Sequence, residues 1–218
     1  QYTTLCIHFV CTAAAPILCA AAVDLAMSKG CSMIIFLNGV SSSGKSSVAR
    51  ALQAAWPTPL LHVGVDTFID MMPARFCGEG EAARDGLQFV PVQTQEGPVV
   101  EIRAGLYAKR LFAGMVGAIG ALARTRNDII VDEVLFGDDM LRDYVRELRG
   151  QTVYFVAIHC ALAIVEQRER ERGDRFINSA RAQFPLVHAP TRAYDFELDT
   201  SLSSPHQLAG AIKEYVAT

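Results

Sequence analysis

Residues 33–52, MIIFLNGVSSSGKSSVARAL, combine three kinds of local sequence within a short span. The apolar run MIIFLN comes first and is typical of a buried strand in a parallel sheet. A loop of small residues follows it, and the apolar residues of SSVARALQAAW, residues 46–56, then recur at helical spacing until Pro57. The stretch therefore predicts a strand, a flexible loop and a helix in direct succession.

The loop, residues 39–46, fits the pattern G-x-x-x-x-G-K-[ST]. Glycines allow such a loop to curl so that backbone N–H groups point at phosphate oxygens, and the following helix adds the positive end of its dipole. Lys45 is expected to reach the β- and γ-phosphates, and the Ser46 hydroxyl to hold Mg²⁺. The alternative is a chance match in a Gly/Ser turn, but the flanking strand and helix favour an ATP-binding loop. The predicted nucleotide-binding residues are Gly39, Val40, Ser41, Ser42, Ser43, Gly44, Lys45, Ser46 and Ser47.

Strand and helix patterns continue to alternate along the chain. The further expected strands are 59–66, 128–136, 152–160 and 193–201, and the expected helices are 46–56, 100–126, 138–150, 161–175 and 204–217. Residues 71–100, rich in glycine, proline and charge, are expected to form a long loop or lid. The alternation predicts an α/β fold with a parallel sheet covered by helices on both faces, in one domain over residues 33–218.

Acidic residues stand at the expected carboxyl ends of two strands, where open α/β sheets bind their ligands. Asp132, in IIVDE, is suited to holding Mg²⁺ directly or through water; the alternative is a capping or loop carboxylate. Glu133 beside it either faces away or orients a water. Asp66, in HVGVD, is either a general base for an attacking hydroxyl or the N-cap of a following helix. Spacing alone does not decide between the two roles of Asp66.

The run RERERGDR, residues 168–175, is rich in arginine. Arginines near a transferring phosphoryl group stabilise its charge through bidentate contacts, but a solvated helix face with Glu–Arg pairs has the same composition. Arg168 and Arg170 are expected on such a solvated face. Arg172 and Arg175 flank the expected end of the helix and are expected to be lid residues.

Two further groups of side chains have both a structural and a functional interpretation. The histidines in or next to apolar runs, each expected to be structural, are His62, His159 and His188. The apolar residues after Asp66, which either line an acceptor site or belong to the core, are Phe68, Met71, Met72 and Phe76.

Composition limits the class of protein. The 218 residues are 51% hydrophobic and 20% charged, with a formal net charge of −3, so no clustered basic excess points to a nucleic-acid surface. None of the six cysteines forms a C-x-x-C pair, which is compatible with a reduced, cytoplasmic compartment and gives no support to a zinc or redox site. Oligomeric state is left open, and a homo-oligomer is possible.

The first 32 residues are expected to be an extension of uncertain role. Residues 5–23, LCIHFVCTAAAPILCAAAV, are long enough to consider as a membrane span or a signal peptide. No Lys or Arg precedes this run, and Pro16 interrupts it. A membrane anchor is therefore the less favoured interpretation.

Five segments, taken together and in this order, resemble the chloramphenicol phosphotransferase family: GVSSSGKSS, GVDTFIDMMP, IIVDEV, RERGDR and VHAPTRAYDFELDTS. A phosphate-binding loop alone is unspecific, whereas the GVDTFIDMMP and RERGDR segments are much more specific. The resemblance runs from about Met33 to near the C-terminus and is weakest over residues 73–100. It departs from the family at the N-terminal extension and at Glu133, where relatives carry a second aspartate.

The resemblance implies a three-layer P-loop NTPase fold of the nucleoside-monophosphate-kinase type, with a five-stranded parallel core. It implies ATP- and Mg²⁺-dependent phosphorylation of the primary hydroxyl of chloramphenicol, with Asp66 as the catalytic aspartate and Arg172 and Arg175 as the lid arginines. The loop at 73–100 is expected to help shape the acceptor pocket.

Three functions remain as alternatives. The first is a small-molecule O-phosphotransferase in which Asp66 acts on the acceptor hydroxyl and Lys45, Mg²⁺ and the lid arginines carry the developing charge. The second is a P-loop ATPase, with Glu133 positioning water; the chain lacks the N-K-x-D and D-x-x-G motifs of a GTPase. The third is a non-enzymatic nucleotide-binding or membrane-tethered module. An acceptor other than chloramphenicol also remains open.

Overall fold

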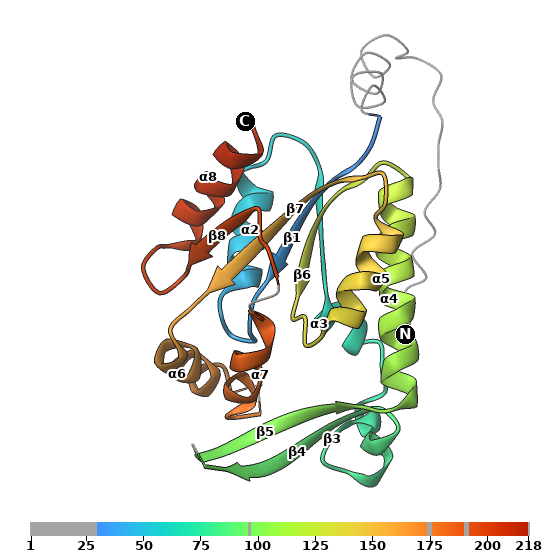
Figure 1. Cartoon of the computed structure of the whole chain (residues 1–218), viewed down its shortest axis with the longest axis vertical. Coiled ribbons are helices and arrows are strands. Elements are labelled where there is room, and N and C mark those ends of the chain that lie inside the picture. The colour runs from blue at the N-terminus through green and yellow to red at the C-terminus, as the bar shows by residue number, and fades with distance from the viewer. Residues whose placement is uncertain (1–29, 96, 174–175, 190–191, 218) are drawn as a thin grey trace, which may run out of the picture. The chain divides into compact units, whose positions relative to one another are not determined.

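The computed structural model describes residues 30–95, 97–173, 176–189 and 192–217. Within them, five strands form one sheet in the order β2-β6-β1-β7-β8, and every neighbouring pair is parallel. The strands are β1 (Met33–Asn38), β2 (Leu60–Gly64), β6 (Asp128–Glu133), β7 (Thr152–His159) and β8 (Phe196–Asp199) (Figure 1). The predicted α/β fold with a five-stranded parallel sheet is confirmed.

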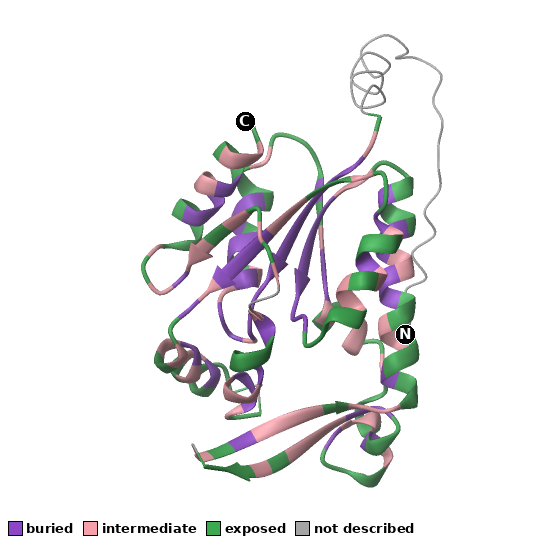
Figure 2. Ribbon diagram, viewed as in Figure 1, coloured by how far each residue is buried: buried purple, intermediate pink, exposed green. Residues whose placement is uncertain are grey.

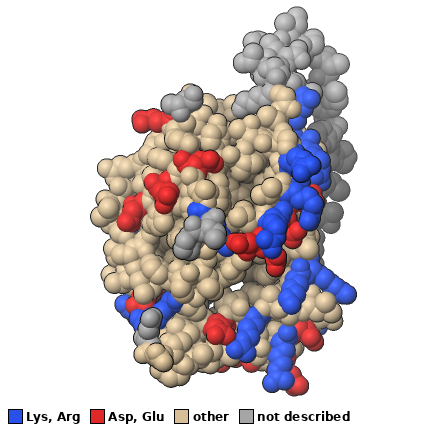
Figure 3. Space-filling model, in the orientation of Figure 1, with Lys and Arg blue, Asp and Glu red and all other residues tan. Residues whose placement is uncertain are grey.

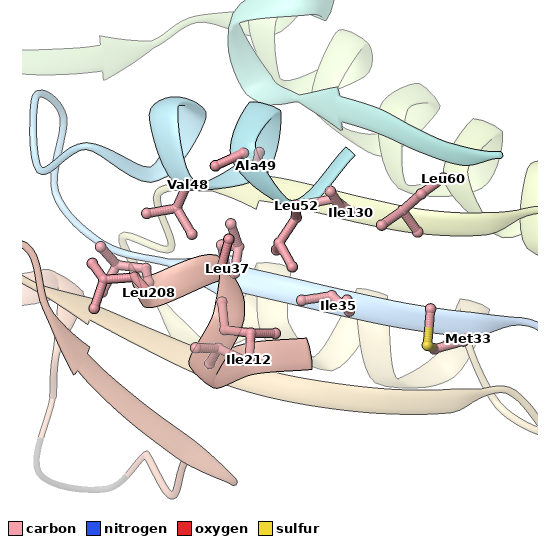
Figure 4. Close-up of a cluster of buried hydrophobic side chains, with 14 residues drawn as sticks. Met33, Ile35, Leu37, Val48, Ala49, Leu52, Leu60, Ile130, Leu208 and Ile212 are labelled. Atoms are coloured by element: carbon pink, nitrogen blue, oxygen red, sulfur yellow. The ribbon is translucent and has the colours of Figure 1, made fainter. Parts of the chain in front are cut away.

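Helices cover both faces of this sheet. They are α2 (Lys45–Ala55), α3 (Val65–Ile69), α4 (Leu106–Arg124), α5 (Asp138–Glu147), α6 (Leu162–Arg172), α7 (Ser179–Val187) and α8 (Pro205–Val216). Successive side chains of a strand point to opposite faces, so β1 contributes to two cores. Met33, Ile35 and Leu37 pack with α2 and α8 (Figure 4). Ile34 and Phe36 pack with α4 and α5.

Strand β1 lies at the centre of the sheet and is buried along its whole length (Figure 2). Its six residues therefore read as a continuous apolar run rather than as an alternating one, as expected for a strand covered on both faces. The buried strand β1 therefore holds the start of the following loop in place.

Helix α4 is the one helix of the described residues that is long and apolar enough to cross a membrane. Its buried residues, which include Met115, Val116 and Ile119, belong to the core on the α4–α5 side of the sheet. Basic side chains gather over α4 and α5 with acidic ones among them (Figure 3), and Arg124 of α4 pairs with Glu147 of α5 at 3.3 Å. Within this fold α4 is thus an amphipathic layer helix.

The region expected to be an irregular loop, residues 71–100, contains regular structure instead. A small sheet consists of β3 (Cys77–Gly78), β4 (Leu87–Thr94) and β5 (Gly97–Ala104). One short 3-10 helix (Ala74–Phe76) precedes β3, and a second one (Glu81–Arg84) lies between β3 and β4. Strands β4 and β5 form an antiparallel hairpin, so the helix expected from residue 100 begins only at Leu106. Pro91 is tolerated in β4 because β3 pairs only with Leu87 and Gln88, so that among the described residues the rest of that edge has no strand partner.

The helix expected over residues 161–175 ends at Arg172, because Gly173 adopts the left-handed conformation (φ 67°) that closes many helices. A separate helix, α7, follows where the sequence pattern predicts no element. The buried carboxylate of Glu169 in α6 accepts hydrogen bonds from Asn178 N, Ser179 Oγ and Ala180 N at the start of α7. Two of these bonds satisfy backbone N–H groups that the first turn of a helix leaves open, and the third is donated by a hydroxyl.

Candidate active site

The loop after β1 has the backbone of a phosphate cradle. Gly44 has a φ of 99°, a conformation that favours glycine, and it directly precedes α2. At Gly39 a Cβ atom would lie 2.5 Å from the backbone oxygen of Ile158 on β7. Both glycines of the motif are therefore required by the geometry, one by its dihedral angle and the other by the close approach of the neighbouring strand.

Lys45, the first residue of α2, turns back onto this loop. Its Nζ donates to the backbone oxygens of Gly39 and Val40, each at 2.9 Å, and lies 3.7 Å from Asp132 Oδ1. The side chain is buried, so its charge acts in a medium of low polarity. An ammonium held here stands at the mouth of the cradle that the loop forms.

Asp132 lies at the end of β6, beside the loop. Its Oδ2 accepts a hydrogen bond from Ser46 Oγ at 2.6 Å and lies 3.4 Å from His62 Nε2. Burial raises the pKa of Asp132, but the charge of Lys45 and the hydrogen bonds from His62 and Ser46 outweigh burial and leave its pKa below the ordinary value. The carboxylate is therefore ionised at neutral pH and directed at the Ser46 hydroxyl.

Two serine hydroxyls of the loop fit a bound polyphosphate. Ser42 Oγ and Ser43 Oγ are buried and have no hydrogen-bond partner among the described residues. Buried polar atoms without partners are rare in proteins and point to a missing ligand or water. Together with the glycine cradle and Lys45, they fit the phosphates of a nucleotide.

The same residues fit Mg²⁺. No group of three or more His, Cys, Asp or Glu side chains suited to a metal ion occurs in the described part of the chain. Mg²⁺ in kinases is held by one or two protein groups together with the phosphates of the substrate, so such a group is not needed. Ser46 and Asp132 are the residues that would hold it.

A cavity of about 970 Å³ opens beside the loop. Its lining joins α2, the end of β2, α3, α6 and the segment after β8. Those of its lining residues that the sequence singles out as site candidates are Ser41, Ser42, Gly44, Lys45, Ser46, Ser47, Asp66, Asp132 and Arg172. Asp66 lies in the first turn of α3, whose N-cap is Gly64, so the N-cap alternative for Asp66 is wrong.

The sequence predicts a structural role for two residues that in fact line the cavity, His62 and Arg168. His62, on β2, lines the cavity and approaches Asp132. Arg168, expected on a solvated face, also lines the cavity: its Nη1 donates to the Ser43 backbone oxygen at 3.1 Å, and its Nη2 to that of Thr200 at 2.9 Å. The pattern of charges on α6 does not reveal which arginine faces inward, because the helix has polar residues all round.

Other candidates lie elsewhere. Phe68 and Met72 are half-buried and do not line the cavity; Phe68 packs against the core of the α4–α5 face. Arg175 lies outside the described residues. His159 and His188 are absent from the cavity lining, and their rings lie against each other at a tilt of 38°, with centroids 4.3 Å apart.

Glu133 faces away from the cavity. It is fully buried, and its carboxylate accepts hydrogen bonds from Tyr144 Oη at 2.8 Å and from Val134 N at 2.9 Å. Burial raises its pKa to about 7, although both hydrogen bonds lower it. Of the two alternatives left by the sequence, the structure favours a residue that holds α5 against the sheet.

Solved structures share this architecture. The Mycobacterium tuberculosis APS kinase, in complex with AMPPNP and APS, matches with a TM-score of 0.57 at 14% identity, over 87% of this chain and 100% of that chain. A gluconokinase from Sinorhizobium meliloti 1021 matches with a TM-score of 0.56 at 18% identity, over 85% of this chain and 91% of that chain. At such identities the likeness shows the fold alone, which is that of a P-loop kinase.

Sequence comparison is more specific. Residues 32–217 match the chloramphenicol phosphotransferase-like protein family, and the chain belongs to that family. Two relatives from Mycobacterium tuberculosis, strains CDC 1551 and H37Rv, are each provisionally named an O-phosphotransferase. Each is 30% identical over 192 residues, which cover 83% of this chain and 80% of the relative. The family resemblance is therefore confirmed, and the protein is a phosphotransferase that acts on a small-molecule hydroxyl.

Proposed function

We propose that the protein is an ATP-dependent O-phosphotransferase that acts in the cytoplasm and phosphorylates the primary hydroxyl of chloramphenicol. The observation that carries the ATP-dependent reaction is the convergence of Lys45, Ser46 and Asp132 at one end of a cavity that Asp66 also lines. A phosphate cradle and a candidate base thus border the same space.

The proposed reaction is a direct transfer. Asp66 accepts the proton of the acceptor hydroxyl, the acceptor oxygen forms a bond to the γ-phosphorus, and the bond from that phosphorus to the β,γ-bridging oxygen breaks. ADP leaves with the electron pair of the broken bond. The negative charge that develops is distributed over groups that this chain already holds in place.

The other residues of the site act on the negative charge of the phosphates. Lys45 leaves the carbonyls of Gly39 and Val40 and pairs with the β- and γ-phosphates. Arg172, at the end of α6 and in the cavity lining, contacts the transferring group from the lid side. Mg²⁺ held by Ser46 and Asp132 would neutralise charge on the β- and γ-phosphates.

The acceptor is the finer part of the proposal. Family membership supports chloramphenicol, which carries a primary alcohol suited to Asp66. Phe68 and Met72 are absent from the cavity lining, and so are the residues of β4 and β5. The proposal that the hairpin of β4 and β5 helps to shape the acceptor pocket therefore rests on the family resemblance and on the contact of Val100 with Asn178 at the start of α7, not on the cavity. Another hydroxylated metabolite is the alternative acceptor.

A hydrolytic ATPase is disfavoured by Glu133. A water-positioning carboxylate must reach the space beyond the γ-phosphate, whereas Glu133 is fully buried and bonded to Tyr144. The inward-facing Asp132 is already engaged with Ser46. Glu133 is therefore not placed to orient a hydrolytic water in this site.

The test is an ATP-consumption assay on the purified full chain with Mg²⁺, with and without chloramphenicol, followed by mass analysis of the antibiotic. The proposal predicts consumption that depends on chloramphenicol and a product heavier by one phosphate. A protein that binds ATP but shows no such turnover is not a chloramphenicol kinase, and a panel of other small alcohols then identifies the acceptor. Fast hydrolysis without any acceptor would overturn the phosphotransferase assignment.

A further inference from the structure

Gln183, in the middle of α7, contacts the phosphate-binding loop from outside the cavity. Its Oε1 accepts a hydrogen bond from the backbone N–H of Ser41 at 2.8 Å, and its side chain is buried. Because a backbone N–H can only donate, the oxygen of the Gln183 amide is the atom that faces it. The G-x-x-x-x-G-K-[ST] pattern of the loop does not predict a hydrogen-bond partner for Ser41 on another helix.

The bond restrains one particular peptide unit. The peptide between Val40 and Ser41 is planar and trans, so its N–H and C=O groups point in opposite directions. On one side, the N–H of Ser41 donates to Gln183. On the other side, the oxygen of Val40 accepts from Lys45 Nζ at 2.9 Å and from Ser43 N at 3.2 Å. Rotation of this peptide would break contacts on both sides.

Gln183 itself rests on a fixed support. The start of α7 is held by the buried carboxylate of Glu169 through three hydrogen bonds. On the same helix, Ala180 and Val187 belong to a buried cluster that includes Val40 of the loop. Helix α7 and the first half of the loop therefore share a core, and the Gln183–Ser41 bond adds a directional contact to it.

We propose that Gln183 is a positioning residue for phosphoryl transfer, an inference that rests on the function proposed above. It holds the Val40–Ser41 peptide so that the Ser41 N–H is kept out of the phosphate cradle and the Val40 carbonyl keeps its bond from Ser43 N when Lys45 turns to the phosphates. The cradle of backbone N–H groups consequently begins after Ser41, although the loop pattern predicts nucleotide-binding residues from Gly39 onward.

The first test measures this bond without relying on catalysis. Backbone amide exchange of the full chain is followed by NMR in the absence of nucleotide. The Ser41 amide is expected to exchange slowly in the wild type, at least tenfold faster in Gln183→Met, and slowly again in Gln183→Glu, which keeps an acceptor oxygen. Addition of MgATP to the wild type should leave Ser41 protected by the same bond. Equal exchange in the wild type and Gln183→Met would overturn the proposal.

The second test separates positioning from a loss of helix stability. Gln183→Met should lower kcat about tenfold while KM for ATP changes less than threefold. Gln183→Glu should recover most of kcat but raise KM for ATP, because its charge repels the phosphates. The matched control is Ser179→Ala, which removes a bond to Glu169 in the same helix without touching the loop. It should lower the melting temperature and leave kcat within twofold of the wild type.

The outcomes distinguish the two proposals. If the wild type transfers phosphate to no tested acceptor, the proposed function fails, and amide exchange with MgATP binding still decides the role of Gln183. If the wild type is active but Gln183→Met and Ser179→Ala lower kcat equally, the positioning role is wrong and Gln183 only stabilises α7. An unchanged kcat in Gln183→Met contradicts the positioning role as well.

Discussion

Asp132 and Glu133 are adjacent residues of β6 that meet opposite environments. Because side chains alternate along a strand, Asp132 turns toward Lys45 and Ser46, whereas Glu133 turns into the core beside Tyr144. The pKa of Asp132 is lowered and that of Glu133 is raised to about 7. Because their side chains point to opposite faces of the strand, Asp132 is an ionised carboxylate at the site, whereas Glu133 has a structural role in the core.

Arg168 provides a test at the residue scale. Its guanidinium bonds to the backbone oxygens of Ser43 and Thr200, joining α6 to the phosphate-binding loop. Hydrogen bonds to charged groups contribute about 1.5–3 kcal/mol, so Arg168→Met should weaken ATP binding about tenfold or more. Arg170→Met, an exposed neighbour on the same helix, is the control and should change the Kd for ATP less than twofold, as measured by calorimetry. Equal effects of the two variants would contradict a specific role for Arg168.

The lowered pKa of His188 predicts that the free energy of unfolding depends on pH. Burial, helped by the nearby charge of His159, lowers its pKa to about 4, although Glu197 acts in the opposite direction and Arg192 and Tyr194 also face the ring. The unfolded chain binds a proton at this residue near pH 6.5, before the folded chain does. The stability that His188 contributes is therefore complete above pH 6.5 and is lost as pH falls toward 4.

The measurement is thermal unfolding of His188→Gln and of the wild type between pH 4 and 8. The variant is expected to be less stable at pH 8, and its deficit should shrink as pH falls. For a chain of this size about 1 kcal/mol shifts Tm by about 2–4 °C, so the change is measurable. His206→Gln, at an exposed histidine of α8, should show a deficit that does not depend on pH. A constant deficit in His188→Gln would contradict the assignment.

At the scale of elements, the sequence predicts best those units whose signals are local. The strand–loop–helix unit around Lys45 follows from a glycine pattern and an apolar run, and both glycines prove to be required by backbone geometry. Helix α7 was not predictable in the same way, because Pro185 interrupts its pattern and its first turn depends on Glu169, which comes from another helix. The contact between Gln183 and Ser41 was equally unpredictable, because Gln183 lies on α7.

Gly39 gives the test at this scale. A Cβ at Gly39 would lie 2.5 Å from the Ile158 backbone oxygen, so Gly39→Ala must displace either the loop or β7. Overpacking of this kind costs about 1–3 kcal/mol, and ATP binding should be lost with it. The control is Gly210→Ala in α8, where nothing lies within 4 Å of the added atom; it should stabilise the fold by about 0.5–1 kcal/mol. Chemical denaturation measures both, and an unperturbed Gly39→Ala would contradict the close packing of the loop.

At the scale of the whole molecule, tertiary contacts determine which side chains meet. Parallel pairing puts Gly64 opposite Asp132, and this register brings α3, with Asp66, beside the phosphate-binding loop. The sequence indicates each of these strand ends but not their order in the sheet. The hairpin of β4 and β5 escapes prediction because its glycines and prolines are also typical of a loop, and its pairing partners are specified only by the fold.

The hairpin also supports a prediction about the acceptor. Phe89 of β4 stacks on Phe176, which follows α6, with ring centroids 4.0 Å apart. Such a pair contributes about 1 kcal/mol, so if the hairpin shapes the acceptor pocket, Phe89→Ala should raise KM for the acceptor about fivefold. KM for ATP should stay unchanged, and Gln93→Ala, at an exposed position of β4, should alter neither constant. A rise in KM for ATP alone would assign the hairpin to the nucleotide instead.

The central claim, that Asp66 activates an acceptor hydroxyl beside a P-loop, is tested most directly by single-turnover transfer of the γ-phosphate from ATP to the acceptor. Asp66→Asn removes the base and keeps the shape, and Asp70→Asn makes the same charge change at the other end of α3, also in the cavity lining. The account predicts that Asp66→Asn slows transfer at least about a hundredfold while ATP binding is retained, and that Asp70→Asn slows it less than fivefold. Transfer at nearly the wild-type rate by Asp66→Asn, or equal losses in the two variants, would contradict it.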